Sequence, residues 1–380
     1  MEPHTTSTKP QRILIGMLDG LGLPIYRASH MPTLNRFEKE GNLFQVVSGV
    51  FPSVTNVNNV SIACGAWPSE HGITANSYYD PNSDQAVYMN DPDLIRSKSI
   101  FQRASEWGVR SAMLTSKKKT AELFRSATEV CIAAEAPEPG LVDKFGPPPP
   151  IYSREINSWL WDVAIDLLAT RPDLGIVYVH TTDYPMHAWH ETDPESLAHL
   201  EEMDARIGRA AQVAPDAAIF LTADHGMNNK TRCYDLDKIC REAGCAVRFA
   251  LSPERDYYIK HHRNFTGCSW LWLDNQGDRE TVRNIVSGLS GVENVMDGAE
   301  VGRRFHTDPA RVGDLVVFGD VDTMFGEMDS AFEELPATYR AHGSMHEMEL
   351  PLFIHNYQGP MPAPEYFRYN LDLTRFLYRT

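Results

Sequence analysis

Short, unbroken runs of apolar residues recur along the chain and predict buried β-strands. Each run has the length of a strand and is too short for a helix of ordinary size. In the first part of the chain the runs lie at 12–18, 109–115, 174–180 and 217–222.

Between these runs, several segments have the apolar spacing of one face of a helix. These segments are 32–41, 55–64, 94–107, 153–170 and 194–213. Strands that alternate with helices form parallel sheets, because each helix returns the chain to the start of the next strand. The pattern therefore predicts an α/β fold with a mostly parallel central sheet flanked by helices.

The pattern changes near residue 246, where apolar segments at 247–250 and 269–273 flank a helix-like stretch at 279–290. We interpret this region as a small α+β cap inserted into the fold, after which apolar runs at 314–318 and 350–354 return to the core. The expected organisation has four parts in chain order. They are a polar tail (1–11), the first part of the core (12–245), the cap (246–310) and the second part of the core (311–380).

Composition and charge exclude some classes of function but do not identify one. The chain carries 51 acidic and 35 basic residues, a formal net charge of −16, which argues against general nucleic-acid binding. A small anionic substrate needs only a local positive site and remains compatible with this charge. The polar N-terminus and the absence of any run of 18 apolar residues predict a protein of the cytoplasm, with no membrane partner.

Residues that bind metals follow the predicted strands. In open α/β sheets, sites lie beyond the carboxyl ends of the strands. An aspartate after one strand is more often a turn or cap residue, and one histidine alone is weak evidence. The combination is much more specific. The residues are Asp19, Asp183 and His187, Asp224 and His225, and His342.

Three aspartates and three histidines form a mixed oxygen and imidazole set that suits Zn²⁺, with Mn²⁺ or Fe²⁺ as competitors. Six protein ligands exceed what one tetrahedral zinc ion takes, so we expect two divalent ions. Two-metal sites of this kind clamp the attacking and leaving groups of phosphoryl transfer.

A nucleophile is expected near the start of helix 55–64, in the segment Phe51-Pro-Ser-Val-Thr-Asn-Val-Asn-Asn59. Thr55 would begin this helix, whose first N–H groups can hold a phosphoryl oxygen. A threonine hydroxyl attacks well only when its pKa is lowered, for example by a metal. Taken alone, Thr55 is more readily a helix cap, and Ser53 is a less favoured nucleophile.

These motifs resemble the alkaline phosphatase superfamily, in its nucleotide pyrophosphatase/phosphodiesterase branch. The nucleophile segment, with Ser61-Ile-Ala-Cys-Gly65 and His71-Gly-Ile73 after it, resembles that branch, and the metal-binding residues follow in the expected order from 12 to about 355. Within the branch the chain is most similar to phosphonoacetate hydrolases. The similar features are Asn56-Val-Asn-Asn59 after the nucleophile, Thr181-Thr-Asp-Tyr184, and Thr115-Ser-Lys-Lys-Lys119.

The resemblance implies a role for each matched residue. One zinc ion would bind Asp183, His187 and His342, and the other would bind Asp19, Asp224, His225 and the Thr55 oxygen. Asn76 would contact a phosphoryl oxygen, and Lys117 and Lys119 would bind a substrate carboxylate. Without the resemblance, residues 117–119 would be a solvated basic helix start. Phe51 departs from the family pattern, which has a small polar residue there.

The expected function is therefore a di-metal hydrolase that cleaves the C–P bond of phosphonoacetate through a phosphothreonine at Thr55. One alternative is a phosphodiesterase or nucleotide pyrophosphatase, in which Phe51, Tyr257, Tyr258 or Phe265 would stack on a base. Others are a hydrolase of a different substituted phosphonate and an inactive metal-binding scaffold. The expected partner is a small anionic organophosphorus substrate, and a homodimer remains open.

Overall fold

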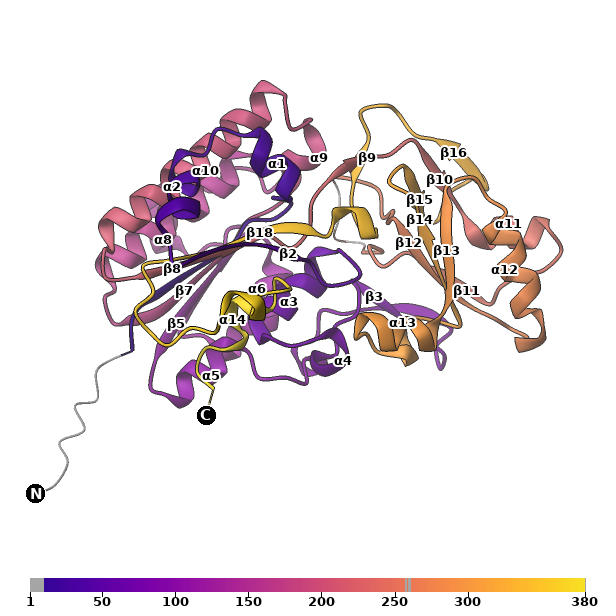
Figure 1. The fold of residues 1–380 in the computed structure, drawn as a ribbon, viewed down its shortest axis with the longest axis horizontal. Coiled ribbons are helices and arrows are strands. Elements are labelled where there is room, and N and C mark those ends of the chain that lie inside the picture. The colour runs from indigo at the N-terminus through magenta and orange to yellow at the C-terminus, as the bar shows by residue number, and fades with distance from the viewer. Residues whose placement is uncertain (1–9, 257, 259–260, 380) are drawn as a thin grey trace, which may run out of the picture.

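A seven-stranded sheet forms the centre of the larger of two lobes (Figure 1). The computed structural model describes residues 10–379 except 257 and 259–260. Most neighbours in the sheet are parallel, whereas β18 runs antiparallel to both β2 and β8. Across the sheet the strands are β2 (Leu43–Ser48), β18 (Glu349–His355), β8 (Ala218–Thr222), β1 (Ile13–Met17), β7 (Leu174–His180), β5 (Arg110–Thr115) and β6 (Val130–Ala133).

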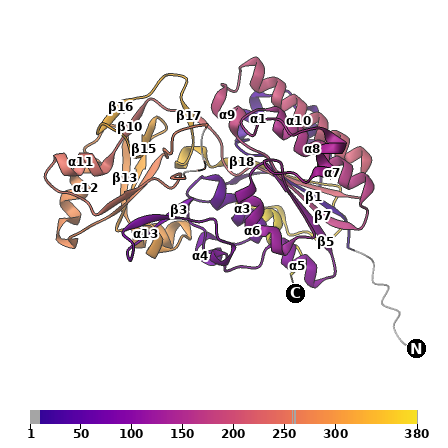
Figure 2. The ribbon, with the colours of Figure 1, turned by 180° about the vertical axis from the view of Figure 1, so that it is seen from behind.

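Helices cover both faces of this sheet, as Figures 1 and 2 show from opposite sides. One layer contains α1 (Leu23–Ala28), α2 (Pro32–Glu40), α8 (Glu155–Thr170) and α10 (Pro194–Val213), and the other contains α3 (Thr55–Cys64), α5 (Ile100–Glu106), α6 (Lys118–Phe124) and α14 (Asp372–Arg375). Smaller helices of this lobe are α4 (Pro68–His71), α7 (Pro139–Phe145) and α9 (Tyr184–Ala188). The α/β prediction is confirmed.

The central strands are apolar throughout because both of their faces are buried. Every residue of β1, β7 and β8 is buried. Ile15 of β1 pairs with Tyr178 of β7 on one side and with Phe220 of β8 on the other. The apolar runs at 12–18, 174–180 and 217–222 are therefore unbroken because the sheet is covered on both sides.

The second lobe is larger than the predicted cap. Its main sheet is antiparallel, in the order β11-β12-β14-β13, and a three-stranded sheet has the order β15-β10-β16. The elements are β10 (Arg232–Tyr234), α11 (Leu236–Glu242), β11 (Phe249–Leu251), β12 (Cys268–Trp272), α12 (Arg279–Ser287), β13 (Val292–Asp297), α13 (Gly298–Phe305), β14 (Leu315–Gly319), β15 (Thr323–Phe325) and β16 (Phe332–Glu334). Two-stranded ladders join β3 (Ser77–Asp80) to β4 (Gln85–Tyr88) and β9 (Asn228–Asn229) to β17 (Arg340–Ala341).

The predicted boundary at 246–310 is wrong on both sides. The sequence pattern places the run 314–318 in the core, but this run forms β14, which pairs with β12 and β13 of the second lobe. The core resumes in its sheet only at β18. A fully buried strand has the same apolar pattern in either lobe, so the pattern could not assign this run. Most of the predicted tail 1–11 lies outside the described residues, and no helix in the described part has both the length and the apolar character needed to cross a bilayer.

A buried ion pair lies where the two lobes meet. Lys230 follows β9 and its Nζ lies 2.8 Å from Glu347 Oε1, with both side chains fully buried. The other oxygen of Glu347 accepts from the Ser344 backbone N–H at 2.8 Å. Glu347 therefore fixes the short segment that begins at His342.

We expect Lys230→Met to lower the free energy of unfolding by about 3–5 kcal/mol, because it leaves a buried carboxylate without its cation. Urea denaturation would measure the change. Lys98→Met is the matched control, since the Lys98–Glu106 pair is exposed and should change stability by less than about 1 kcal/mol. Equal effects in the two variants would contradict this role for the buried pair.

Candidate metal centre

Three adjacent strands deliver acidic residues to one edge of the sheet. Asp19 lies just beyond β1, Asp183 just beyond β7 and Asp224 just beyond β8. Because β1 lies between β8 and β7 and is parallel to both, their carboxyl ends meet. The structure thus brings together the three predicted aspartates.

The first group, which we call the Asp19 group, contains Asp19, Asp224 and His225, whose ligand atoms all lie within 4.8 Å of one another. His225 Nε2 lies 3.5 Å from Asp19 Oδ1 and 3.3 Å from Asp224 Oδ2. Thr55, the first residue of α3, places its Oγ1 3.1 Å from His225 Nε2 and 3.4 Å from Asp19 Oδ1. The predicted nucleophile therefore lies beside this group.

The second group, the Asp183 group, contains Asp183, His187 and His342. Asp183 Oδ2 lies 2.7 Å from His187 Nε2, and the one-turn spacing across α9 explains why both face the same way. His342 Nε2 lies 3.6 Å from the same oxygen. The rings of His342 and His225 stack with their centroids 3.6 Å apart, so the two groups adjoin.

Backbone carbonyls fix the orientation of all three predicted histidine ligands. Nδ1 of His187 donates to Arg340 O at 2.7 Å, that of His225 to Gly226 O at 2.9 Å, and that of His342 to Ser53 O at 2.9 Å. A carbonyl can only accept, so each Nδ1 carries the proton and each Nε2 presents a lone pair. Histidine ligands of metals are held in this way.

The electrostatics of the site call for cations. Burial, and then the charges of Asp183 and Asp224, hold the pKa of Asp19 well above its ordinary value. Asp19 Oδ2 and Asp224 Oδ2 are buried and have no hydrogen-bond partner among the described residues. Buried charges need a counter-charge or a metal ion. Carboxylate oxygens and imidazole lone pairs in this arrangement fit two divalent ions, one in each group.

Lys117 and Lys119 lie at the start of α6, beyond β5, but they have different surroundings. Burial opposes the charge of Lys117, yet Asp183, Asp19 and two further carboxylates together raise its pKa, so it stays protonated. Lys119 forms a buried ion pair with Asp256 of the second lobe. Burial lowers the pKa of Lys119 despite this partner. The two lysines therefore differ in their surroundings, whereas the resemblance gives both of them the same role.

A small pocket of about 180 Å³ opens beside these lysines and is lined in part by Tyr152, Tyr258 and His261. His261 Nε2 lies 3.5 Å from Asp183 Oδ1, so the pocket adjoins the Asp183 group. Asn76 is buried near the second lobe, and its side chain donates to Glu254 O at 3.4 Å. Its contact with a phosphoryl oxygen stays a prediction.

Four residues near the two groups were not predicted from the sequence: His180, Glu254, His261 and His262. His180 Nε2 lies 3.6 Å from Asp19 Oδ2, and burial lowers the pKa of this imidazole to about 3. As the last residue of β7, it looked like part of the strand. The other three belong to the predicted cap, where the adjacent pair His261-His262 was the only available signal.

Two of the four aromatic residues considered for base stacking, Phe51 and Phe265, are buried. The Phe51 ring packs 4.8 Å from that of Phe305 and 5.2 Å from that of Phe318, with 1% of its surface exposed. Phe265 is also buried, in a cluster that includes Met324. Tyr258 lines the small pocket, and Tyr257 lies outside the described residues.

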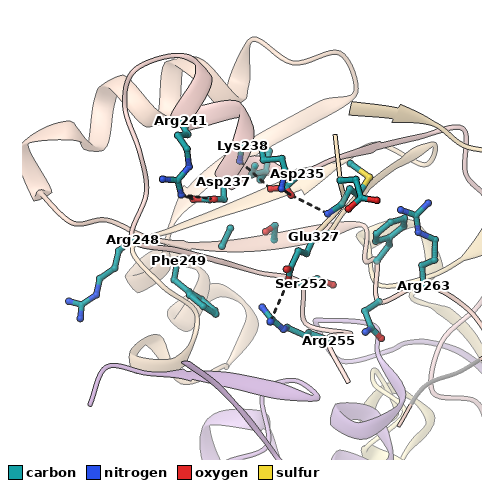
Figure 3. A pocket seen from close by; sticks show the side chains of 18 residues that line it. Asp235, Asp237, Lys238, Arg241, Arg248, Phe249, Ser252, Arg255, Arg263 and Glu327 are labelled. Atoms are coloured by element: carbon teal, nitrogen blue, oxygen red, sulfur yellow. Dashed lines mark hydrogen bonds and ion pairs between the residues drawn. The ribbon is translucent and has the colours of Figure 1, made fainter. Parts of the chain in front are cut away.

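A larger cavity of about 730 Å³ lies within the second lobe, away from the predicted site residues (Figure 3). Its basic side chains are already neutralised, since Arg241 pairs with Asp237 at 2.8 Å and Arg255 with Glu327 at 3.3 Å. Within the described residues, none of the predicted metal-binding or substrate-binding side chains lines it. The two lysines predicted to bind substrate line the smaller pocket instead.

Comparison with known proteins agrees with this arrangement. A family model described as type I phosphodiesterase / nucleotide pyrophosphatase matches residues 13–345. The chain belongs to this family. Curated relatives include a bis(5'-adenosyl)-triphosphatase from Bos taurus, 26% identical over 252 residues, which are 64% of this chain and 52% of that protein. Venom phosphodiesterase 2 from Crotalus adamanteus is 27% identical over 52% of this chain and 24% of its own length. The chain thus spans about half of the length of the curated relatives it matches, or less.

Similar solved structures extend the match to nearly the whole chain. A phosphonoacetate hydrolase from Sinorhizobium meliloti 1021, in complex with phosphonoformate, is 28% identical with a TM-score of 0.85, covering 97% of this chain and 95% of that one. Murine ectonucleotide pyrophosphatase / phosphodiesterase 5, at 16% identity and a TM-score of 0.68, supports the shared fold alone. The recognition of this branch, and of the similarity to phosphonoacetate hydrolase within it, is confirmed.

Proposed function

We propose that this protein hydrolyses phosphonoacetate to acetate and phosphate, with two divalent ions, most readily Zn²⁺, and Thr55 as nucleophile. The observation that carries the proposal is the small pocket of about 180 Å³, in which charged Lys117 lies next to the Asp183 group. The similarity to the Sinorhizobium meliloti enzyme supports the same substrate.

Thr55 Oγ1 attacks phosphorus, since it lies within 3.4 Å of both Asp19 and His225 at the start of α3. A P–O bond forms to Thr55 as its hydroxyl proton passes to solvent, and the C–P bond breaks. The bonding electron pair passes to the methylene carbon and delocalises into the substrate carboxylate, which faces Lys117. The two metal ions, when bound, neutralise the phosphonate and make the threonine hydroxyl and the hydrolytic water more acidic.

The methylene carbon then takes a proton from solvent, and acetate leaves. Water hydrolyses the phosphothreonine, which releases phosphate and restores the Thr55 hydroxyl. Lys117 contributes by stabilising negative charge that grows on the carboxylate as the C–P bond breaks. Its position in a buried pocket strengthens this effect, because water screens the charge less there.

The alternative is a phosphodiesterase or nucleotide pyrophosphatase that uses the same metal groups. Family membership favours it, and the curated relatives are phosphodiesterases and triphosphatases. Two observations count against it. The Phe51 ring is packed in the hydrophobic core, and the pocket beside Lys117 is smaller than the roughly 300–1,000 Å³ typical of larger ligands.

The test compares phosphonoacetate with the nitrophenyl ester of a nucleoside monophosphate, using purified protein loaded with zinc. We expect kcat/KM for phosphonoacetate to exceed that for the ester by at least about a hundredfold, because the ester leaves Lys117 without its carboxylate. Released phosphate and nitrophenol are measured. A preference for the ester would reject the proposal, and turnover of another carboxylated phosphonate alone would redirect it to that substrate.

A further inference from the structure

One segment of the second lobe reaches over the metal groups. It joins β11 to β12, and we call its described residues, 252–256, 258 and 261–267, the bridging segment. The Asn76 backbone N–H donates to Pro253 O at 2.9 Å, and Asp256 pairs with Lys119. The segment then brings His261 and His262 against the Asp183 group. The second lobe therefore contributes directly to the metal centre.

His262 has the same geometry as the predicted ligands. Its Nδ1 donates to Arg263 O at 2.7 Å, which leaves the lone pair on Nε2. Its ring stacks on that of His187 with the centroids 4.1 Å apart and the planes at 17°. Ligand atoms of His187, His262 and His342 all lie within 4.8 Å of one another.

His262 is buried beside a carboxylate that does not reach its Nε2. The side chain is 6% exposed, and the carboxylate beside it, Glu254 Oε1, lies 3.9 Å away, beyond hydrogen-bond distance. Burying an imidazole lone pair costs free energy unless a donor or a metal ion binds it. A divalent ion held by His187 and His342 would satisfy it.

His261 contacts a different atom of the same group. Its Nε2 lies 3.5 Å from Asp183 Oδ1, whereas His187 and His342 face Oδ2. The side chain is 1% exposed, and neither ring nitrogen has a hydrogen-bond partner in the described part of the chain. Its ring packs 4.7 Å from that of Tyr152. His261 is thus placed to donate to Oδ1 of Asp183 and to orient that carboxylate.

We propose that His262 is an additional ligand of the metal ion in the Asp183 group and that His261 is a positioning residue for Asp183. The inference rests on the two-metal centre of the proposed function but not on its substrate. It predicts that this ion binds residues from both lobes, so that metal binding also fastens the second lobe to the core.

The test replaces each histidine by glutamine and measures metal binding with Co²⁺, whose visible spectrum reports the number and type of ligands. We expect His262→Gln to change the spectrum and to lower the affinity for one of the two ions at least about tenfold. His261→Gln should keep the spectrum but weaken the same ion by roughly 10- to 100-fold, as expected for a residue that orients a ligand. His30→Gln, on the exposed surface, is the matched control.

An unchanged spectrum and affinity in His262→Gln would overturn the assignment. A measurement on the unaltered protein guards against a variant that fails to fold. Loaded with ¹¹³Cd, the protein should show scalar coupling from cadmium to the ring protons of His187, His225, His262 and His342. Coupling to only His187, His225 and His342 would reject His262 as a ligand. Loss of phosphonoacetate turnover with intact two-metal binding would reject the substrate and leave this inference standing.

Discussion

Thr55→Ala is expected to abolish phosphate release while metal content stays near two ions per chain. Removing a nucleophile whose hydroxyl forms the covalent intermediate costs on the order of 10³- to 10⁶-fold in kcat. The Asp and His residues of both groups are untouched, and the Thr55 oxygen is only one of several atoms around the Asp19 group. Steady-state phosphate release and metal analysis of the same preparation would measure the two quantities.

Two matched variants separate attack by Thr55 from a general disturbance of the loop before α3. Thr55→Ser keeps a hydroxyl at the same place and should retain far more activity than Thr55→Ala. Ser53→Ala removes the neighbouring hydroxyl, which donates to Ser344 O at 2.7 Å, and should keep most of the activity. If Ser53→Ala were inactive and Thr55→Ala active, the nucleophile assignment would be wrong.

The sequence predicted the part of the site that depends on parallel strands. Asp19, Asp183 and Asp224 each follow a buried apolar run, and parallel strands end at one edge. The order β8-β1-β7 then makes their convergence unavoidable. Helix 55–64 was also predicted at its observed bounds, from its apolar spacing after the break at Pro52. Local pattern and sheet geometry were sufficient here.

Other features depend on contacts that no local pattern records. The strand Leu43–Ser48 was missed because its edge position leaves several residues partly exposed. The helix expected at 94–107 begins only at Ile100, where Ser99 caps it. Strand 315–319 was placed in the wrong lobe because burial looks the same in both. In each case tertiary pairing overrides the local pattern.

The bridging segment explains why the substrate side of the site was predicted less well than the metal side. Glu254, Asp256, His261 and His262 follow no core strand, so apart from the adjacent histidine pair nothing in their spacing indicated the core active site. They reach it because the second lobe packs over the ends of the core strands. The ion pair between Lys119 and Asp256 is the clearest consequence, since one lysine of the expected pair is already neutralised.

Lys117→Met should therefore have the largest effect of any substitution in the substrate pocket. Truncating one partner of a buried charge pair costs about 2–5 kcal/mol, which is roughly 30- to several-thousandfold in kcat/KM for phosphonoacetate. An aryl phosphodiester lacks the carboxylate, so its kcat/KM should fall much less. Kinetics on both substrates give the ratio, and equal losses would contradict the carboxylate role.

The matched comparison is the double variant Lys119→Met/Asp256→Asn, which removes both charges of the second pair and leaves no buried ion unpaired. If Lys117 alone presents positive charge to the carboxylate, this variant should lose less than about tenfold in kcat/KM for phosphonoacetate. If both lysines bind the carboxylate, as the resemblance implies, the double variant should lose as much as Lys117→Met. The size of this one difference decides how many lysines hold the substrate.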